Sequence, residues 1–212
     1  TTDIFGGSTG KALYSLDYDA SDTSGTYNGT PTDVEFGVGG QINTGAKFNG
    51  TTSKIQITSP LGVALSNAND NFTSSMWVMF DSVSSSAGSF HGSIVGDYTG
   101  SNYGSFHIYV YGLGAGNGLA FAMERYFNNI GYYNTNFSTV GSTSSVQADT
   151  WHHIVHTYVG STKQVKFYLD NVLIATYTLD QPATGRTTNA FNVFGDYDNR
   201  GAHGHAGRID QI

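Results

Sequence analysis

Three segments of the chain combine tyrosine with aspartate, asparagine or arginine. Tyrosine rings can stack on the C–H faces of sugars, while carboxylate, amide and guanidinium groups hydrogen-bond to sugar hydroxyls. Loops at one end of a β-sandwich converge, so segments that are far apart in sequence can build one site. We therefore predict a ligand-binding site formed by the following residues: Asp97, Tyr98, Tyr103, Arg125, Tyr126, Tyr132, Tyr133, Asp196, Tyr197, Asp198, Asn199 and Arg200.

The same residue types are also the ones that turns require, because aspartate, asparagine and glycine tolerate positive φ and cap local backbone groups. Residues 196–200 form the densest polar cluster of the chain, and both a ligand site and a solvated turn stay open for them. An exposed tyrosine could equally pack against a neighbouring subunit.

Carboxylates that could cleave a glycosidic bond are scarce. Such hydrolysis needs two carboxyl groups held about 5 to 10 Å apart. The chain has only two glutamates, Glu35 and Glu124, which are far apart in sequence and lack acidic neighbours at alternate positions. Asp17 and Asp19 alternate, so we expect them on one strand face, without an acid partner. No nucleophile elbow is predicted either, because Gly-x-Ser-x-Gly occurs only at residues 6–10, in the lead-in, outside any predicted strand-to-helix turn. We therefore expect no catalytic residues and no enzymatic activity.

The histidines do not show the spacing of a metal site. His152 and His156 fall on one face of a predicted strand, but four residues span about 13 Å, too far to share a zinc ion with ligands at about 2 Å. We expect them to be core or sheet-face residues. His203 and His205 lie in a predicted loop, which we expect to be solvated.

Composition excludes several classes of partner. The net charge is -7 and no basic stripe occurs, so we expect no binding to nucleic acid or anionic membranes. No apolar run reaches the roughly 20 residues of a membrane span, so we expect no membrane insertion. Charged residues make up only 12% of the chain, and polarity comes mainly from Ser, Thr, Asn and Gly. This composition suits an extracellular or particle surface, and it is equally typical of β-rich proteins in general.

Short runs of alternating apolar and polar residues, separated by turn residues, predict an all-β sandwich or barrel without helices. Asn49-Gly50 predicts a hairpin turn, and Asp170-Asn171 predicts a type I′ turn. Residues 19–40 and 126–145 are predicted to be long loops. The predicted strands are 12–17, 46–49, 54–57, 72–80, 93–96, 105–111, 119–124, 151–159, 165–169, 172–179, 191–195 and 207–212.

An ordered set of segments carries a family resemblance: 12–17 (ALYSLD), 22–25 (DTSG) with 28–30 (NGT), 45–50 (GAKFNG), 55–57 (IQI), 72–78 (FTSSMWV), 151–158 (WHHIVHTY), 165–172 (VKFYLDNV) and 207–210 (GRID). In this order they resemble the laminin-G-like family of concanavalin A-like lectin and glucanase domains. The resemblance implies a two-sheet antiparallel jelly-roll sandwich. We expect one domain over residues 11–212 after a lead-in over residues 1–10. In its Gly/Asn/Tyr-rich style the chain also resembles modules of bacteriophage virion fibres and surface appendages.

Two departures from the family pattern stand out. Asn171 occupies a position where the family usually has glycine, a conservative change at a site of positive φ. The chain also stops at Ile212, whereas the family's closing strand continues and pairs beside the opening strand. We therefore expect a truncated closing strand, as in a piece of a longer polypeptide.

The resemblance also implies a metal site, because many family members bind one structural Ca²⁺ where the loop after the first strand meets the closing strand. In this chain it implies Asp22, Asn28 and Asp210 as ligands, and oxygen ligands are those that calcium prefers. The alternative is that Asp22 caps a turn and that Asp210 accepts hydrogen bonds from the backbone.

Three functions remain to be separated. The first is a lectin-like adhesion module on a virion or another extracellular surface, with a glycan or cell-surface polysaccharide as its partner. The second is a structural decoration or assembly module, whose partners would be other virion subunits in a homo-oligomer. The third is a glycoside-active enzyme, which would need two converging carboxylates in a cleft.

Overall fold

The computed structural model describes the backbone of nine stretches, which contain strands and turns but no helix. Side chains are described in residues 10–57, 71–83, 146–178 and 204–212. Five further strands are described by their backbone alone: 90–96, 107–112, 119–127, 131–135 and 191–195. Within these stretches we find no helix long and apolar enough to cross a membrane.

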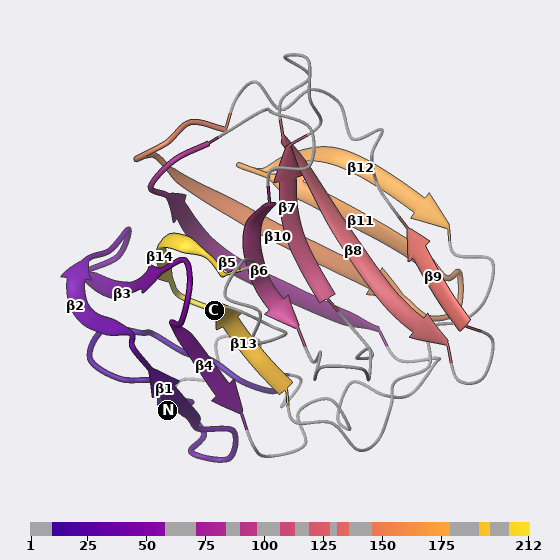
Figure 1. Cartoon of the computed structure of the whole chain (residues 1–212). Coiled ribbons are helices and arrows are strands. Elements are labelled where there is room, and N and C mark those ends of the chain that lie inside the picture. The colour runs from indigo at the N-terminus through magenta and orange to yellow at the C-terminus, as the bar shows by residue number, and fades with distance from the viewer. Residues whose placement is uncertain are drawn as a thin grey trace.

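The first sheet contains seven antiparallel strands in the order β1-β4-β13-β6-β7-β8-β9 (Figure 1). Adjacent strands often come from distant parts of the chain, since β13 lies between β4 and β6. The bounds are β1 Gly29–Thr32, β4 Lys54–Ile57, β6 Phe90–Gly96, β7 His107–Gly112, β8 Leu119–Phe127, β9 Gly131–Thr135 and β13 Phe191–Gly195.

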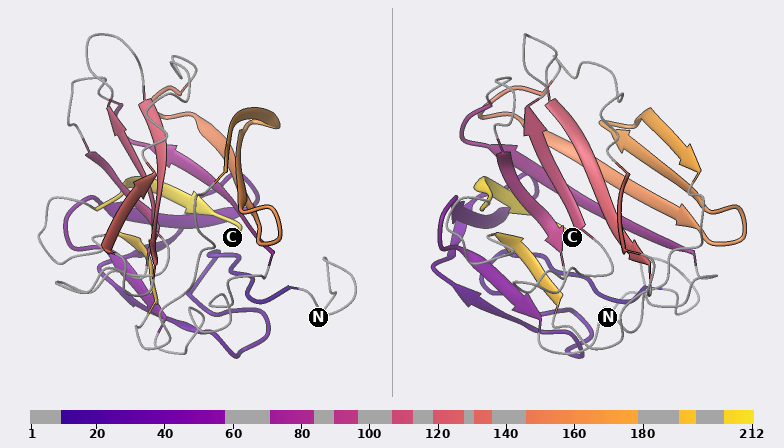
Figure 2. Two further views of the ribbon diagram at one scale, coloured as in Figure 1. Left: turned by 90° about the vertical axis from the view of Figure 1, so that its right-hand side faces the viewer. Right: turned by 45° about the vertical axis from the view of Figure 1, so that its right-hand side comes forward.

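The second sheet also contains seven antiparallel strands, in the order β12-β11-β10-β5-β14-β3-β2, and it faces the first sheet (Figure 2). The two sheets confirm the prediction of an all-β antiparallel sandwich. The bounds are β2 Glu35–Gly39, β3 Thr44–Asn49, β5 Phe72–Phe80, β10 Trp151–Val159, β11 Gln164–Leu169, β12 Val172–Thr178 and β14 Ala206–Asp210.

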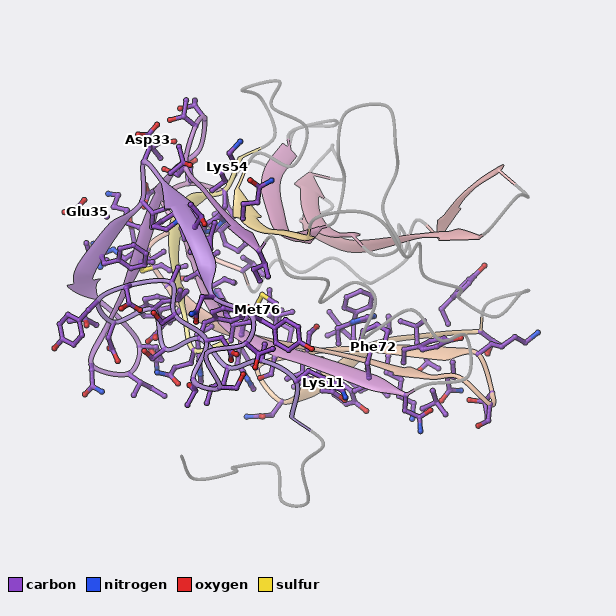
Figure 3. All side chains as sticks on the ribbon, turned by 90° about the horizontal axis from the view of Figure 1, so that it is seen from below. Lys11, Asp33, Glu35, Lys54, Phe72 and Met76 are labelled. Carbon is purple, nitrogen blue, oxygen red and sulfur yellow. The ribbon has the colours of Figure 1, made fainter. Side chains whose placement is uncertain are left out.

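The core lies between the sheets and follows from the alternation of buried and half-buried residues, which is strict on β10 and β11. Every second residue of β10 is buried, and these residues face the first sheet. Phe72 and Met76 of β5 point into the same space (Figure 3). The largest fully buried side chains are Tyr158, Phe48, Phe80, Phe167, Leu16, Ile55, Ile57 and Met76.

The opening segment is not the strand that alternation predicts over residues 12–17. Only Tyr14 pairs there, in an isolated bridge with Asp22. Tyr14 also exchanges two backbone hydrogen bonds with Ile212, at 2.8 and 2.9 Å. Leu16 has a φ of 58°, which interrupts extended backbone, so Asp17 and Asp19 do not share a strand face. The long loop predicted over residues 19–40 is also wrong, because it contains β1 and β2.

The Asn49-Gly50 turn does not form a hairpin as predicted. β3 belongs to the second sheet and β4 to the first, so this turn carries the chain from one sheet to the other. The Asn49 Oδ1 atom accepts hydrogen bonds from the backbone N–H groups of residues 51–53, at 2.9 to 3.0 Å. Gly50 has a φ of 81°. This positive φ suits both a hairpin within one sheet and a turn that crosses between sheets. Tertiary packing decides which of the two forms.

Residues 126–145 do not form one continuous loop. β8 continues to Phe127, and β9 adds a strand over Gly131–Thr135. Tyr126 pairs with Tyr132, and Arg125 pairs with Tyr133. The sequence prediction gave too much weight to asparagine and glycine here, although tyrosine favours strands.

The hairpin between β11 and β12 confirms its sequence-based prediction. Asp170 and Asn171 have φ values of 50° and 66°, as a type I′ turn requires. Leu169 and Val172 pair directly on either side of this turn. Asparagine therefore serves here in place of the family's usual glycine.

Candidate functional site

Part of the predicted ligand site gathers at one end of the first sheet. Gly96, the last residue of β6, pairs with His107, the first residue of β7, and His107 also pairs with Glu124 of β8. We call this the Gly96 end. The segment with Asp97, Tyr98 and Tyr103 starts here, although these residues lie outside the described part of the chain. The β8–β9 hairpin brings four further predicted residues to the same end: Arg125, Tyr126, Tyr132 and Tyr133.

The third predicted segment starts elsewhere. β13 begins beside the Gly96 end, where Asn192 pairs with Gly96, and it runs away from it, because Gly195 pairs with Ser93. The chain therefore leaves β13 in the direction opposite to the Gly96 end. Residues 196–200, with Asp196, Tyr197, Asp198, Asn199 and Arg200, follow from this point and lie outside the described residues. The strand directions thus favour two groups of residues over one convergent site.

Asp22 organises the turn that follows the opening segment. Its Oδ1 atom accepts a hydrogen bond from the Leu13 N–H at 2.9 Å, and its Oδ2 atom accepts from the Ser24 hydroxyl and from the Tyr27 N–H at 3.2 Å. Its own N–H donates to Asn28 Oδ1 at 3.0 Å. Burial alone would raise the pKa of Asp22, but these hydrogen bonds outweigh it and lower the pKa below its ordinary value.

Asp210 holds the turn between β2 and β3 from the far end of the chain. Its Oδ2 atom accepts a hydrogen bond from the Ile42 N–H at 2.7 Å, and its side chain is fully buried. Burial raises the pKa of Asp210, and the nearby charge of Asp17 adds to this rise against the opposing backbone hydrogen bonds. Asp17 secures the same turn, because its Oδ1 atom accepts from the Thr44 N–H and hydroxyl at 3.1 and 3.0 Å.

The implied calcium ligands are therefore engaged with hydrogen-bond donors. Both carboxylate oxygens of Asp22 and the amide oxygen of Asn28 accept hydrogen bonds. The N–H groups that donate these bonds carry partial positive charge, which would repel a calcium ion at the same oxygens. Among the residues whose side chains are described, no group of three or more His, Asp or Glu could hold a metal ion. Asp22 and Asn28 thus fit the turn-capping alternative better, and calcium binding through Asp22, Asn28 and Asp210 stays a prediction.

The carboxylates show no arrangement for glycoside cleavage in the described part of the chain. Glu35 lies exposed on β2 of the second sheet, whereas Glu124 belongs to β8 of the first sheet. Asp17 and Asp210 do influence each other. Asp210 is fully buried, however, so a sugar cannot reach between the two carboxyl groups.

An aspartate–histidine pair joins the buried His152 to the exposed Asp170, for which the sequence predicted only a turn. His152 Nδ1 lies 2.8 Å from Asp170 Oδ2, the contact that orients a catalytic histidine in hydrolases. The Gln147 N–H donates to the other ring nitrogen, Nε2, at 3.3 Å. A general base needs that nitrogen free, so this pair is not set up for catalysis. It links the β11–β12 turn, through Asp170, to β10 and to Gln147.

Two other histidines are buried among aromatic rings. His156 lies between Phe72 and Phe167, with ring centroids 5.2 and 4.9 Å away, which confirms the core assignment. His205 is fully buried beside Phe48 and Phe80, so the prediction of a solvated loop is wrong for this residue. Its ring makes T-shaped contacts with both phenylalanine rings, at centroid distances of 6.1 and 5.3 Å. The sequence pattern His-Gly-His does not indicate this packing.

The outer face of the second sheet carries aromatic side chains that the sequence analysis did not assign. Trp77 and His153 are opposite each other in register and stack with ring centroids 4.8 Å apart. The only available signal was their position between buried neighbours on two predicted strands.

Two facing antiparallel sheets closed by the pairing of Tyr14 with Ile212 define a β-sandwich of the jelly-roll class. The family model of the concanavalin A-like lectin/glucanases superfamily, of the laminin-G type, matches residues 49–212. The chain therefore belongs to this superfamily. In a comparison with curated proteins, none matches the sequence.

Solved structures share the fold at low sequence identity. Domain 4 of AbnA, a GH43 extracellular arabinanase from Geobacillus stearothermophilus solved with arabinotriose, is 21% identical with a TM-score of 0.62. That match covers 94% of this chain and 88% of the other. The Ruminococcus gnavus IT-sialidase CBM40 bound to α2,3-sialyllactose is 17% identical, with a TM-score of 0.54 over 79% of this chain and 86% of the other.

A toxin domain extends this comparison. The binding domain of Paraclostridial Mosquitocidal Protein 1 is 18% identical with a TM-score of 0.64. The match covers 95% of this chain but 48% of the toxin chain, so this sandwich corresponds to about half of that domain.

Proposed function

We propose that the chain is a non-catalytic carbohydrate-binding module that attaches its parent protein to glycans. The observation that supports this most strongly is the set of similar sandwiches, which includes domains solved with arabinotriose and with α2,3-sialyllactose. A further similar structure, from botulinum neurotoxin type C, comes from work on its interaction with two ganglioside molecules. The shared fold is shown at under 25% identity, and the shared activity is our inference.

For the binding site we propose the Gly96 end. The β8–β9 hairpin pairs tyrosine with tyrosine and arginine with tyrosine there. Tyrosine can stack on a sugar and arginine can form bidentate hydrogen bonds, and the paired strands that carry these residues lose little backbone freedom on binding. The neighbouring segment with Asp97, Tyr98 and Tyr103 would complete this site, and residues 196–200 would contribute to a separate one.

The absence of activity is part of the proposal. It is supported by the separation of Glu35 and Glu124 onto different sheets and by the burial of Asp210. The function of this module would then be attachment to glycans, and any catalytic activity of the parent protein would belong to another part of it.

We further propose that the module works outside the cell, with a bacteriophage virion as the particular setting. The low content of charged residues and the richness in Gly, Asn and Tyr support an extracellular surface. The virion setting rests on the resemblance in sequence style to fibre and appendage modules.

Titration calorimetry with soluble polysaccharides, arabinotriose and α2,3-sialyllactose tests the proposed site. Tyr132 and Tyr133 are consecutive on β9 and therefore project from opposite faces, so we expect one of Tyr132→Ala and Tyr133→Ala to weaken binding about tenfold or more and the other to have little effect. Tyr177→Ala on β12 is the matched control and should bind like the unchanged chain. If the control and the hairpin variants bind equally well, the Gly96 end is not the site.

One observation favours the assembly alternative. Three exposed large apolar side chains, Val172, Leu173 and Tyr177, lie on β12 at the edge of the second sheet. Exposed apolar edge strands are frequent contact surfaces between chains. Analytical ultracentrifugation separates the two functions, because an assembly module predicts a defined oligomer without sugar binding.

A further inference from the structure

Both tryptophans of the chain lie on the outer face of the second sheet. The chain contains two, Trp77 on β5 and Trp151 on β10. Met76 and Val78 flank Trp77 and are fully buried in the core, so alternation directs Trp77 away from it. The buried His152 places Trp151 on the outer face in the same way. Tryptophan is highly buried on average, so placing both residues outside needs a reason.

Hydrogen bonds fix the centre of this face. Trp77 stacks on His153 with an interplanar angle of 28°. The Ser75 hydroxyl and the ring nitrogen His153 Nε2 form a hydrogen bond of 2.9 Å, while the backbone N–H of His153 donates to Asp170 Oδ1 at 2.8 Å. The imidazole is therefore held in one orientation, and it holds the indole in turn. Such preorganisation lowers the entropic cost of binding a ligand.

The aromatic surface continues along the neighbouring strands. Met79 pairs with Trp151 on one side of the stacked pair, and Val155 pairs with Tyr168 on the other. Trp77 and Trp151 are diagonal neighbours on adjacent strands, which places their backbones about 7–8 Å apart. Except for Met79, which is buried, these side chains are half-buried and form a low surface. We call the set the outer platform: Trp77, Met79, Trp151, His153, Val155 and Tyr168.

Hydroxyl groups and charged side chains of both signs border the outer platform, since Asp170 accepts from the backbone N–H of His153 and Asp210 pairs with Trp77. Thr73 and Thr157 pair next to it on β5 and β10, and Lys166 pairs with Thr157 from β11. Arg208 pairs with Met79 on the other side. An apolar, aromatic centre with hydrogen-bonding groups at its margin matches the C–H face and the peripheral hydroxyls of a sugar ring.

We infer that the outer platform is a second carbohydrate-binding surface, which takes a neutral polysaccharide lying flat across β5 and β10. This inference rests on the proposed function and adds a surface separate from the Gly96 end. A sugar ring fits the size of the platform, whereas a stable protein interface needs about 20–30 residues from each partner. The net charge of -7 also opposes close approach of a second copy.

Intrinsic fluorescence tests the inference directly, because both tryptophans of the chain belong to the outer platform. Titration of the intact chain with soluble β-glucan, galactan or arabinan should shift the tryptophan emission to the blue and protect it from acrylamide quenching. The same titration is followed by calorimetry. Calorimetric binding without any change in fluorescence would place sugars elsewhere and overturn the inference while leaving the proposed function intact. No binding by either method would overturn both.

Variants provide an independent test. Trp151→Ala should weaken polysaccharide binding about tenfold or more, in line with the loss of an aromatic anchor. Tyr177→Ala again serves as the control, and thermal unfolding verifies that each variant is folded. If Trp151→Ala is unfolded, the fluorescence titration of the unchanged chain still decides the matter. A folded Trp151→Ala variant with unchanged affinity would contradict the inference.

Discussion

Two buried aspartates, Asp22 and Asp210, have pKa values that are shifted in opposite directions. Asp22 is surrounded by N–H and O–H donors, which favour its charged form. Asp210 is buried with the charge of Asp17 nearby, which favours its neutral form. The pKa of Asp22 is therefore lowered and that of Asp210 is raised. Each shift makes folding depend on pH with its own sign.

Replacing Asp22 should destabilise the fold near neutral pH. A lowered folded pKa means that the contribution of Asp22 is present above the ordinary aspartate pKa and is lost as pH falls through the folded value. We expect Asp22→Asn to lower the free energy of unfolding at pH 7 by about 1–3 kcal/mol, because charged hydrogen bonds are lost. Urea unfolding at pH 7 and pH 3 measures this, and the difference from the unchanged chain should shrink at pH 3.

Replacing Asp210 should have the opposite pH signature. A raised folded pKa means that its contribution is present below the ordinary aspartate pKa and is lost as pH rises through the folded value. Asp210→Asn keeps an acceptor for the Ile42 N–H and removes the buried charge beside Asp17. At pH 7 we expect the free energy of unfolding of Asp210→Asn to equal or exceed that of the unchanged chain. A loss of more than about 1 kcal/mol there would show that the charge of Asp210 is needed.

Calcium provides a further test at the residue scale. Because Asp22 and Asn28 are already engaged with backbone donors, we expect the melting temperature to be the same in excess chelator and in millimolar calcium. A ligand at 100 times its Kd would stabilise the fold by about 2.7 kcal/mol, which a thermal melt detects readily. A clear rise in melting temperature with calcium would instead support the metal site that the family resemblance implies.

At the scale of elements, two similar turn signals give different outcomes. Asp170-Asn171 joins two strands of one sheet, whereas Asn49-Gly50 joins strands of opposite sheets. Both turns place residues at positive φ, and Gly50 has a φ of 81°. In addition, a Cβ atom on Gly50 would lie 2.8 Å from the Ala206 Cβ atom.

Substitutions at these two turns should therefore differ in effect. Gly50→Ala adds strain at positive φ and a close contact with Ala206, and we expect it to destabilise the fold by about 1–2 kcal/mol or more. Asn171→Gly accepts the same conformation without strain, so its effect should stay within about 0.5 kcal/mol. Denaturant unfolding of both variants measures the difference, and equal stabilities would contradict the role assigned to Gly50.

Much of the fold could be predicted from the sequence, because alternation in Trp151–Val159 and Gln164–Leu169 reports directly on burial. The segment over residues 12–17 alternates as well, yet Leu16 turns to positive φ and only Tyr14 pairs. Which sheet a strand joins depends on contacts between distant residues, and local patterns do not contain them. The prediction of one convergent ligand site was affected most, because the direction of β13 leads the chain away from the Gly96 end before residues 196–200.

At the scale of the whole molecule, the sandwich offers two kinds of surface that the core does not use. The Gly96 end carries tyrosines and an arginine on a hairpin, and the outer platform carries both tryptophans on adjacent strands of the second sheet. Two weak sites on one rigid body can engage the same polysaccharide together. The combined affinity can then exceed either one, provided that the spacing of the sites matches the chain of sugars.

The claim that the chain recognises carbohydrate is tested most directly by a glycan array probed with the intact protein, with and without calcium. Our account predicts reproducible binding to a group of structurally related glycans. An array that stays silent in both conditions, together with no retention on soluble polysaccharides, would contradict it.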